Sequence, residues 1–354
     1  MKIRSLYPLR FEPHFRYRAW GGRRLATLLG AVLPGDGPIG ESWLLSDRED
    51  HSSCIQNGSL KGYTLGAVLQ QWPEQLLGDG AEPGLRFPLL LKLLDVTDSL
   101  SVQVHPSDTQ LDHLPGAEKG KTEAWVVLTA GAKARVYAGL KANTSARSLR
   151  EAIAGGRVVE LLAGFVPEAG DAVLVPAQTV HSLSDVVVIE VQENSDVTLR
   201  LFDWDRVDPK TQQPRPLQIE DALACIDFGQ GAILPVEPLV ETETPARRER
   251  LFDDPHFKVW RIGSNTPFAV GATQAPRVLA CLTGRGVVWF ADEKYPLGAG
   301  EAMLLPAQVG RCRCDPHGEI TLLEIALPPD ILPACPINHL EGSASRVCGC
   351  ARTW

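Results

Sequence analysis

The sequence predicts a mainly β protein built from two related units, with a few short helices. Three observations indicate this class. The 354 residues include 32 glycines and 27 prolines, which favour many short strands and turns over long helices. Short apolar runs alternate with turn residues, without the strand–helix alternation of a parallel sheet. Finally, one segment occurs twice: residues 169–178 read AGDAVLVPAQ, and residues 299–308 read AGEAMLLPAQ.

This internal repeat implies two copies of one β-rich unit, because seven of its ten positions are identical. The first copy continues to His181, whereas the second has Arg311 at the equivalent position. We therefore expect a metal-binding unit followed by a metal-free structural partner. The predicted domains are a catalytic, metal-binding domain at 1–235, a metal-free domain at 236–340 and a cysteine-bearing tail at 341–354.

The other elements follow from periodicity along the chain. Residues 64–77 have apolar positions at helical spacing, with Thr64 as N-cap, and Pro73 predicts a break near residues 71–72. Two further helices are predicted at 145–154 and 219–225. The proline-bearing residues 203–216 are predicted as a loop or linker. Strands are predicted at 87–94, 100–105, 124–128, 134–138, 170–175, 186–192 and 198–203.

Composition narrows the possible partners. The formal net charge of −8 gives no reason to expect nucleic acid or an anionic membrane, so an anionic substrate would need a local basic site. No apolar run approaches a membrane span, and the first residues lack a secretory signal pattern. We expect a cytoplasmic protein that acts on a small molecule, with no nucleic acid and no membrane. The oligomeric state, monomer or homodimer, stays open.

Eight cysteines are concentrated towards the end of the chain. Without a secretory signal, a disulfide framework is not expected. Cys312-x-Cys314 and Cys348-x-Cys350 could hold a structural metal, but the x2 spacing typical of zinc knuckles is absent. Buried thiols and a loose tail are the simpler interpretation.

The candidate metal ligands come from separate strands. Alternation puts Ser101, Gln103 and His105 on one face of a short strand. Glu123 opens a later apolar run, and His181 follows the first copy of the repeat. Imidazoles, a carboxylate and an amide oxygen suit a divalent metal, above all zinc, with open positions for a substrate.

Two cupin motifs are recognisable. Both copies of the repeat resemble the cupin pattern Gly-x5-Pro-x-Gly-x2-His, with Gln178 and Gln308 in place of the second glycine. Gln103-x-His105 followed by Glu123 resembles the first cupin motif, with Gln where many cupins have His. The resemblance implies two cupin barrels, that is, jelly rolls or double-stranded β-helices.

A more specific resemblance covers residues 5–225 and, more weakly, the second unit. It rests on motifs in a fixed order: RAWGG, GESW, FPLLLKLLDVTDSLSVQVHPSD, GKTEAW, VPAQTVHSL and VQENSDVTLRLFDWDR. These resemble the zinc-dependent type I mannose-6-phosphate isomerases of the short bacterial form. The resemblance implies a sugar-phosphate aldose–ketose isomerase that interconverts mannose 6-phosphate and fructose 6-phosphate through a cis-enediolate, with one zinc ion per chain.

The resemblance also assigns residues. Its catalytic arginine falls on Arg200, the lysine of its GKTE motif on Lys121, and the aspartate of its NSD motif on Asp196. Leu199 replaces the usual aromatic residue and Glu193 the more usual Gln, which affects pocket shape more than chemistry. The family's zinc ligands fall on Gln103, His105, Glu123 and His181.

Isomerisation moves a proton between C1 and C2, so it needs a cation near two oxygens and a group that carries protons. Arg200 would lie near the enediolate or the phosphate. Lys121 should face the same cavity as Glu123, where it would shuttle protons or hold phosphate. Ser101 would contact phosphate, and Asp196 would assist proton transfer or orient Arg200. The sequence does not identify the base.

Alternatives remain. The chain could act on another sugar phosphate, or bind one without catalysis as a sensor whose second barrel is the output surface. An iron-dependent cupin oxygenase is a further class, against which Lys121 and Arg200 argue. Two other carboxylates have open roles: Glu190 could support a histidine ligand, and Glu41 could line an active site or lie at the surface beside a core Trp43.

Overall fold

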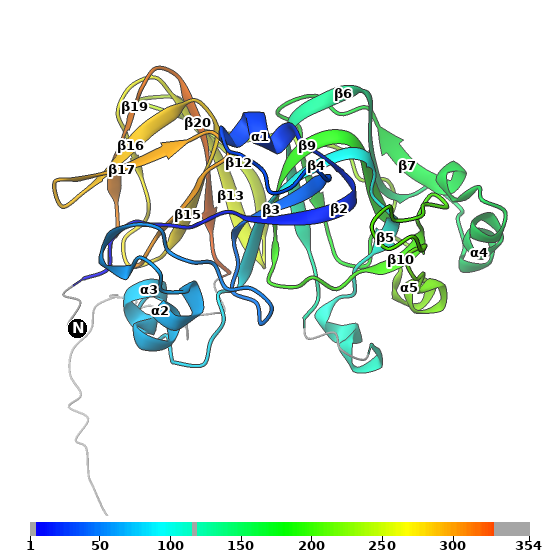
Figure 1. Cartoon of the computed structure of the whole chain (residues 1–354). Coiled ribbons are helices and arrows are strands. Elements are labelled where there is room, and N and C mark those ends of the chain that lie inside the picture. The colour runs from blue at the N-terminus through cyan, green and yellow to red at the C-terminus, as the bar shows by residue number, and fades with distance from the viewer. Residues whose placement is uncertain (1–4, 115–118, 329–354) are drawn as a thin grey trace, which may run out of the picture.

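The structure is a computed structural model that describes residues 5–114 and 119–328. Its strands form three sheets that curl into two β-barrels lying side by side (Figure 1). One barrel is a nine-stranded sheet, and the other combines a seven-stranded with a four-stranded sheet. The predicted mainly β fold with two cupin barrels is confirmed.

The nine-stranded sheet has the order β10-β5-β9-β4-β2-β3, and β6 pairs with β7, β8 and β9. Its strands are β2 His14–Gly22, β3 Ile39–Leu45, β4 Leu89–Ser99, β5 Val102–Val104, β6 Glu123–Leu140, β7 Leu162–Phe165, β8 Ala172–Val175, β9 His181–Glu193 and β10 Leu199–Phe202. We call this the first barrel.

The seven-stranded sheet has the order β1-β18-β15-β20-β13-β12-β11, and the four-stranded sheet the order β14-β19-β16-β17. Together they form the second barrel. Their strands are β1 Leu9–Arg10, β11 Leu239–Thr242, β12 Arg247–Asp254, β13 Phe257–Ser264, β14 Phe268–Val270, β15 Arg277–Thr283, β16 Arg285–Phe290, β17 Glu293–Gly298, β18 Ala302–Leu305, β19 Cys312–Pro316 and β20 Ile320–Ala326.

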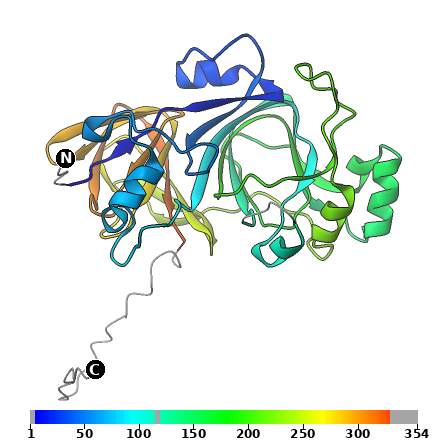
Figure 2. The same ribbon diagram turned by 60° about the horizontal axis from the view of Figure 1, so that its bottom comes forward.

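The helices are short and lie outside the barrels (Figures 1 and 2). None of those in the described ranges combines the length and apolarity needed to cross a membrane. They are α1 Arg24–Leu29, α2 Leu65–Gln71, α3 Pro73–Leu77, α4 Ala146–Ala154, α5 Ile219–Cys225 and the 3-10 turns η1 Gly58–Leu60, η2 Asp108–His113 and η3 Val158–Leu161.

Two local predictions can be compared with these elements. The helix predicted at 64–77 is broken as expected: α2 ends at Gln71, α3 begins at Pro73, and the Thr64 hydroxyl caps α2 by accepting the Ala67 N–H at 3.2 Å. The two strands predicted at 124–128 and 134–138 were wrong as separate elements. They form the single strand β6, because both segments pair with β9. The register of this pairing shifts between Val127 and Thr129 and between Ala130 and Arg135, but the strand continues.

Strand β4 separates two cores. Its Leu91 and Leu93 side chains belong to the large core shared with the second barrel, whereas Leu94 and Val96 point into the first barrel. Successive side chains of a strand point to opposite faces, and here each face is covered by one of the two cores. Every residue of β4 from Leu89 to Val96 is therefore buried. Lys92 shares the face of Leu94, so the same alternation directs its ammonium group into the first barrel.

The internal repeat forms equivalent strands in the two barrels. AVLV at 172–175 is β8 and AMLL at 302–305 is β18. Gly170 and Gly300 precede them with φ of +97° and +79°, a conformation that favours glycine. Gln178 has φ of +70°, which explains why cupins commonly have glycine at this position.

The segment that contains β1 reaches across to the second barrel. Strand β1 pairs with β18, and the Leu76 carbonyl of α3 accepts the Ala307 N–H at 2.9 Å. Figure 2 shows this early segment and α2–α3 lying against the second barrel. The division of the chain at residues 235 and 236 therefore stays a proposal, and the tail predicted at 341–354 lies outside the described residues.

Within the described ranges, the cysteines are free thiols and belong to no cluster of three potential metal ligands. Cys312 and Cys314 are buried in β19, and burial raises the pKa of the Cys314 thiol to about 12. This agrees with the simpler interpretation of Cys312-x-Cys314. Cys348-x-Cys350 lies outside the described residues.

Candidate active site

Strand pairing brings the predicted ligands together at one end of the first barrel. His105 directly follows β5, Glu123 begins β6 and His181 begins β9. Gln103 of β5 pairs with His181 on one side and with Arg200 of β10 on the other. Directly opposed residues project from the same face of a sheet. Arg200, Gln103 and His181 therefore form one row across three strands.

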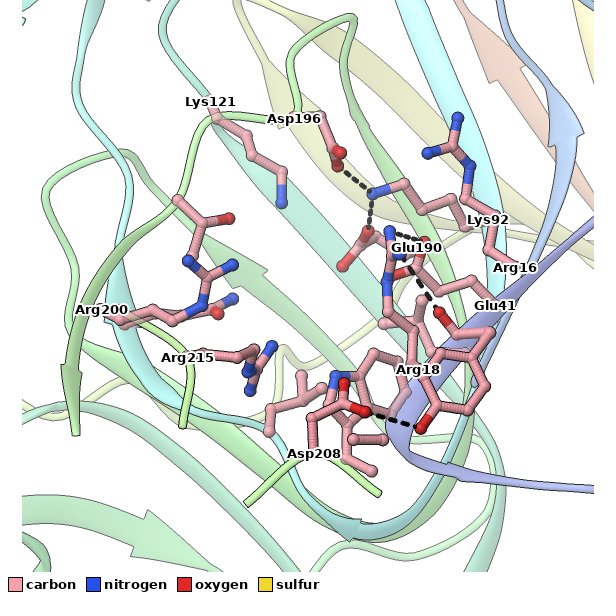
Figure 3. A pocket seen from close by; sticks show the side chains of 17 residues that line it. Arg16, Arg18, Glu41, Lys92, Lys121, Glu190, Asp196, Arg200, Asp208 and Arg215 are labelled. Carbon is pink, nitrogen blue, oxygen red and sulfur yellow. Dashed lines mark hydrogen bonds and ion pairs between the residues drawn. The ribbon is translucent and has the colours of Figure 1, made fainter. Parts of the chain in front are cut away.

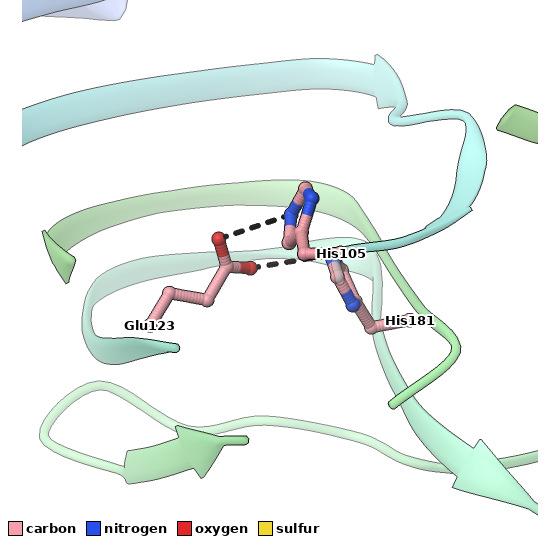
Figure 4. A group of neighbouring side chains, drawn as sticks. All are labelled: His105, Glu123 and His181. Atoms are coloured by element: carbon pink, nitrogen blue, oxygen red, sulfur yellow. Dashed lines mark ion pairs between the residues drawn. The ribbon is translucent and has the colours of Figure 1, made fainter. Parts of the chain in front are cut away.

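The two histidines converge on the carboxylate of Glu123 (Figure 4). His105 Nε2 lies 3.3 Å from Glu123 Oε2, and His181 Nε2 lies 3.2 Å from Oε1. All three side chains are at most 1% exposed. Their nearest possible ligand atoms are therefore shielded by protein and aimed at one point.

The charge states suit metal binding. Burial, reinforced by the Lys121 ammonium, lowers the pKa of His105 to about 3, and burial also lowers the pKa of His181. For Glu123, burial opposes ionisation, but the Lys121 ammonium holds its pKa well below the usual range. Two neutral imidazoles therefore face one ionised carboxylate at neutral pH.

The geometry also fits a divalent ion. Four ligand atoms with bonds of about 2.1 Å around a tetrahedral ion lie about 3.4 Å apart. The 3.2 and 3.3 Å separations are close to this value. His181 Nδ1 donates to the Thr179 carbonyl at 2.8 Å, which leaves Nε2 to act as the ligand atom. These three residues could therefore hold a metal ion.

Three other predicted residues lie around this group. Gln103 Nε2 is 3.1 Å from His181 Nε2, and its Oε1 accepts from the Ser101 hydroxyl at 3.0 Å. The amide oxygen would face His181 only after a 180° rotation of the amide. Ser101 is buried behind Gln103, and it is Gln103 that lines the neighbouring cavity. Lys121 Nζ lies 2.6 Å from Glu123 Oε2.

The cavity beside this group has a volume of about 420 Å³ and is strongly polar (Figure 3). Arg200 and Arg215 lie on one side of it, with Arg18 and Lys92 across the space. The lining includes six cationic and four anionic side chains: Arg16, Arg18, Lys92, Lys121, Arg200 and Arg215, with Glu41, Glu190, Asp196 and Asp208. The cavity lining therefore carries an excess of positive charge, although the chain as a whole is acidic.

Arg200 is the notable cation of this cavity. It forms no ion pair within the described part of the chain, and the neighbouring Asp203 carboxylate is occupied by Arg215 at 2.5 and 2.8 Å. Its buried Nε has no hydrogen-bond partner among the described residues. Burial and the nearby Arg215 charge lower the pKa of Arg200, so its cation is poorly compensated. An anion in the cavity would supply that compensation.

Lys92, by contrast, is fully paired. Its Nζ lies 3.2 Å from Asp196 Oδ1 and 3.3 Å from Glu190 Oε1. Trp125 Nε1 donates to the other Glu190 oxygen at 3.0 Å. These side chains also come from one row, because Trp43, Lys92, Glu190 and Trp125 are directly opposed across β3, β4, β9 and β6.

Two further carboxylates are ionised by their neighbours. For Asp196, burial raises the pKa, but Lys92 and Lys121 overcome this effect and hold it at about 2. Glu41 accepts from Arg18 at 2.6 and 2.9 Å and from Trp43 Nε1 at 2.8 Å. It is buried and lines the cavity, so of its two open roles the structure supports the first.

Sequence reasoning missed several residues of the cavity. Arg215 and Asp208 come from the predicted 203–216 loop, which gave no recognisable site pattern, and Arg18 begins the RAWGG motif but was assigned no role. Tyr17 and Asp208 meet across the mouth through a 3.0 Å hydrogen bond, although they are far apart in the chain. Lys92 carried a usable signal, since a lysine within the apolar run FPLLLKLL must be buried or paired.

Replacing Lys92 tests this buried network. Lys92→Met removes the buried cation between the buried Glu190 carboxylate and the partly exposed Asp196 carboxylate, so we expect the free energy of unfolding to fall by about 3 kcal/mol. Urea unfolding followed by fluorescence measures this. Lys258→Met is the matched control, because the exposed Lys258–Asp253 pair should contribute less than about 1 kcal/mol. Equal losses in the two variants would contradict the buried network, and Glu190→Gln should restore part of the loss in Lys92→Met.

Comparisons with known proteins agree with this geometry. The family model described as "Phosphomannose isomerase type I, catalytic domain" matches residues 9–127. The chain is 31% identical over 315 residues to mannose-6-phosphate isomerase ManA of Bacillus subtilis, covering 88% of this chain and 97% of that protein. Identity to mannose-6-phosphate isomerase of Streptococcus mutans is also 31%, over 322 residues, covering 88% of this chain and 96% of that protein.

The three-dimensional similarity extends equally far. The crystal structure of the mannose 6-phosphate isomerase from Bacillus subtilis matches with a TM-score of 0.83 at 29% identity, covering 91% of this chain and 100% of that chain. The shared sequence and the shared fold thus both include the two barrels. The chain belongs to the type I phosphomannose isomerase family.

Proposed function

We propose that this chain is a zinc-dependent aldose–ketose isomerase that interconverts mannose 6-phosphate and fructose 6-phosphate. The observation that carries the proposal is the position of the buried His105–Glu123–His181 group beside a cavity that contains an uncompensated Arg200. Relatives that align over almost their whole length are named mannose-6-phosphate isomerases.

The residues would hold one zinc ion at this site. Two neutral imidazoles and a carboxylate form a donor set that zinc favours, and Gln103 would be a further ligand through its amide oxygen. When bound, the ion supplies Lewis-acid stabilisation of the negative charge that develops on substrate oxygens. It would also compete with the Lys121 ammonium for Glu123, which favours turning that ammonium towards the cavity.

The cavity favours a phosphorylated substrate. A sugar phosphate carries a charge of about −1.5 to −2 near neutral pH. The lining has two more cationic than anionic side chains, although the whole chain is acidic. Arg200 would contact the phosphate or the enediolate, because a guanidinium without a carboxylate partner is free to bind an anion bidentately. Ser101 stays a predicted phosphate contact.

The reaction removes the C2 proton of the aldose and returns a proton to C1, while the hydroxyl proton on O2 is transferred to O1. Lys121 is the proposed proton carrier, since its Nζ lies at the border of the metal group and the cavity. Asp196 has a pKa of about 2, which makes it a weak proton acceptor. We therefore propose that Asp196 positions Lys92 and the substrate, and that the base is not Asp196.

A coupled assay of purified, zinc-loaded protein tests the proposal. We expect turnover of mannose 6-phosphate to fructose 6-phosphate. Glucose 6-phosphate, which differs only at C2, and unphosphorylated mannose should have much lower kcat/KM values. Absence of turnover with folded, zinc-loaded protein would rule out mannose 6-phosphate as substrate. Faster turnover of another sugar phosphate in the same panel would support the alternative substrate, and binding without turnover would support a sensor.

A further inference from the structure

A second group of potential ligands lies where the two barrels meet. Asp108 begins η2, Glu193 ends β9, and His256 lies in the turn between β12 and β13 of the second barrel. Their ligand atoms all lie within 4.8 Å of one another. The three residues come from three separate segments, so chain proximity does not account for the cluster. We call it the junction cluster.

His256 is oriented as metal-ligating histidines usually are. Its Nδ1 lies 2.8 Å from Asp254 Oδ1, which fixes the N–H on that side of the ring. The other nitrogen, Nε2, then points at Glu193 Oε2, 3.6 Å away. A carboxylate that holds one ring nitrogen leaves the lone pair of the other available to an ion.

Glu193 provides the second, independent observation. The residue is 2% exposed, and its Oε1 accepts no hydrogen bond from any described residue. Its Oε2 accepts the Thr122 N–H at 2.8 Å, which fixes the carboxylate in the cluster. The neighbouring charge is the Lys119 ammonium, 3.4 Å from Oε1. Burying an ionised carboxylate is costly unless a cation compensates it.

Asp108 completes the group from the solvent side. One of its oxygens accepts the Gly120 N–H at 2.6 Å, so the carboxylate is oriented by backbone. The residue is exposed, which leaves room for water in the remaining coordination positions. One imidazole and two carboxylates form a donor set common in sites for zinc and related divalent metals.

We propose that Asp108, Glu193 and His256 bind a second divalent cation, which links the first barrel to the second. The ion neutralises the two carboxylates and joins a strand of the first barrel to a turn of the second. This inference does not rest on the proposed function, because it concerns a different group of residues. The competing occupant is a proton: a charged His256 would form a simple ion pair with Glu193.

Metal stoichiometry tests the site. The full chain, stripped with a chelator and dialysed, is titrated with Zn²⁺ by calorimetry and then analysed for bound metal. We expect two equivalents per chain, and one equivalent in His256→Gln. His317→Gln, which removes an exposed histidine elsewhere in the second barrel, should keep both equivalents. One equivalent in the unaltered chain that is lost in His256→Gln would still place an ion at the junction cluster. Equal stoichiometries in the unaltered chain and in His256→Gln would overturn the proposal.

Two further variants separate a metal from an ion pair. Asp254→Asn removes the group that orients His256, so Zn²⁺ affinity at this site should fall about 10- to 100-fold. Lys119→Gln removes the competing cation, and affinity should rise several-fold. If the cluster is only an ion pair, neither variant will change Zn²⁺ binding. The titrations contain no sugar phosphate, so failure of this site and failure of the proposed isomerase activity are distinguishable.

Discussion

Removing the metal from the His105–Glu123–His181 group is expected to lower mannose 6-phosphate turnover by about 10³-fold. The proposed reaction places negative charge on two adjacent substrate oxygens, and an ion held by these three residues would provide the main compensation for it. Turnover by the coupled assay should disappear in chelator-stripped protein and return when Zn²⁺ is restored. Turnover that persists in fully stripped protein would contradict a metal-dependent mechanism.

Substituting one of the three possible metal ligands tests whether the loss of turnover comes from this site. Glu123→Gln keeps the size of the side chain but removes the charge that holds the ion, so both bound metal and turnover should fall. His256→Gln is the matched control, since it removes a histidine from the junction cluster and should leave turnover unchanged. A similar loss of activity in both variants would show that the effect is not specific to the His105–Glu123–His181 group.

Arg200→Ala should lower kcat/KM by about 10²–10³-fold without lowering the stability of the protein. The guanidinium has no carboxylate partner among the described residues, and burial lowers its pKa, so the folded protein gains little from this charge in the absence of substrate. The free energy of pairing the Arg200 guanidinium with an anion is therefore available for binding the substrate. Steady-state kinetics and urea unfolding of the same preparation measure the two effects.

Two controls accompany this variant. Arg200→Lys keeps the charge but loses the planar fork, so activity should be recovered only in part. Lys92→Met should lose stability, because the buried Lys92 ammonium is paired with two carboxylates whereas Arg200 is paired with none among the described residues. If Arg200→Ala unfolds as easily as Lys92→Met, then Arg200 is a structural cation and its proposed contact with the substrate is wrong.

Much of the fold could be predicted because local rules and the internal repeat agreed. The repeat at 169–178 and 299–308 correctly placed equivalent strands in two barrels. Pro73 ended one helix because proline cannot continue it. The single long strand β6 could not be predicted, since its continuity depends on pairing with β9 along its length.

The sequence by itself determined the family, the two-barrel fold and the three residues that meet as a possible metal site, His105, Glu123 and His181. It could do so because these features lie in short motifs whose residues and order resemble those of a known family. Only the tertiary structure decided which charges are compensated. Arg200 and Lys92 are both cations in apolar segments, but strand register gives Lys92 two carboxylates and leaves Arg200 without one. The junction cluster likewise exists only because the two barrels pack together, which brings His256 beside Glu193.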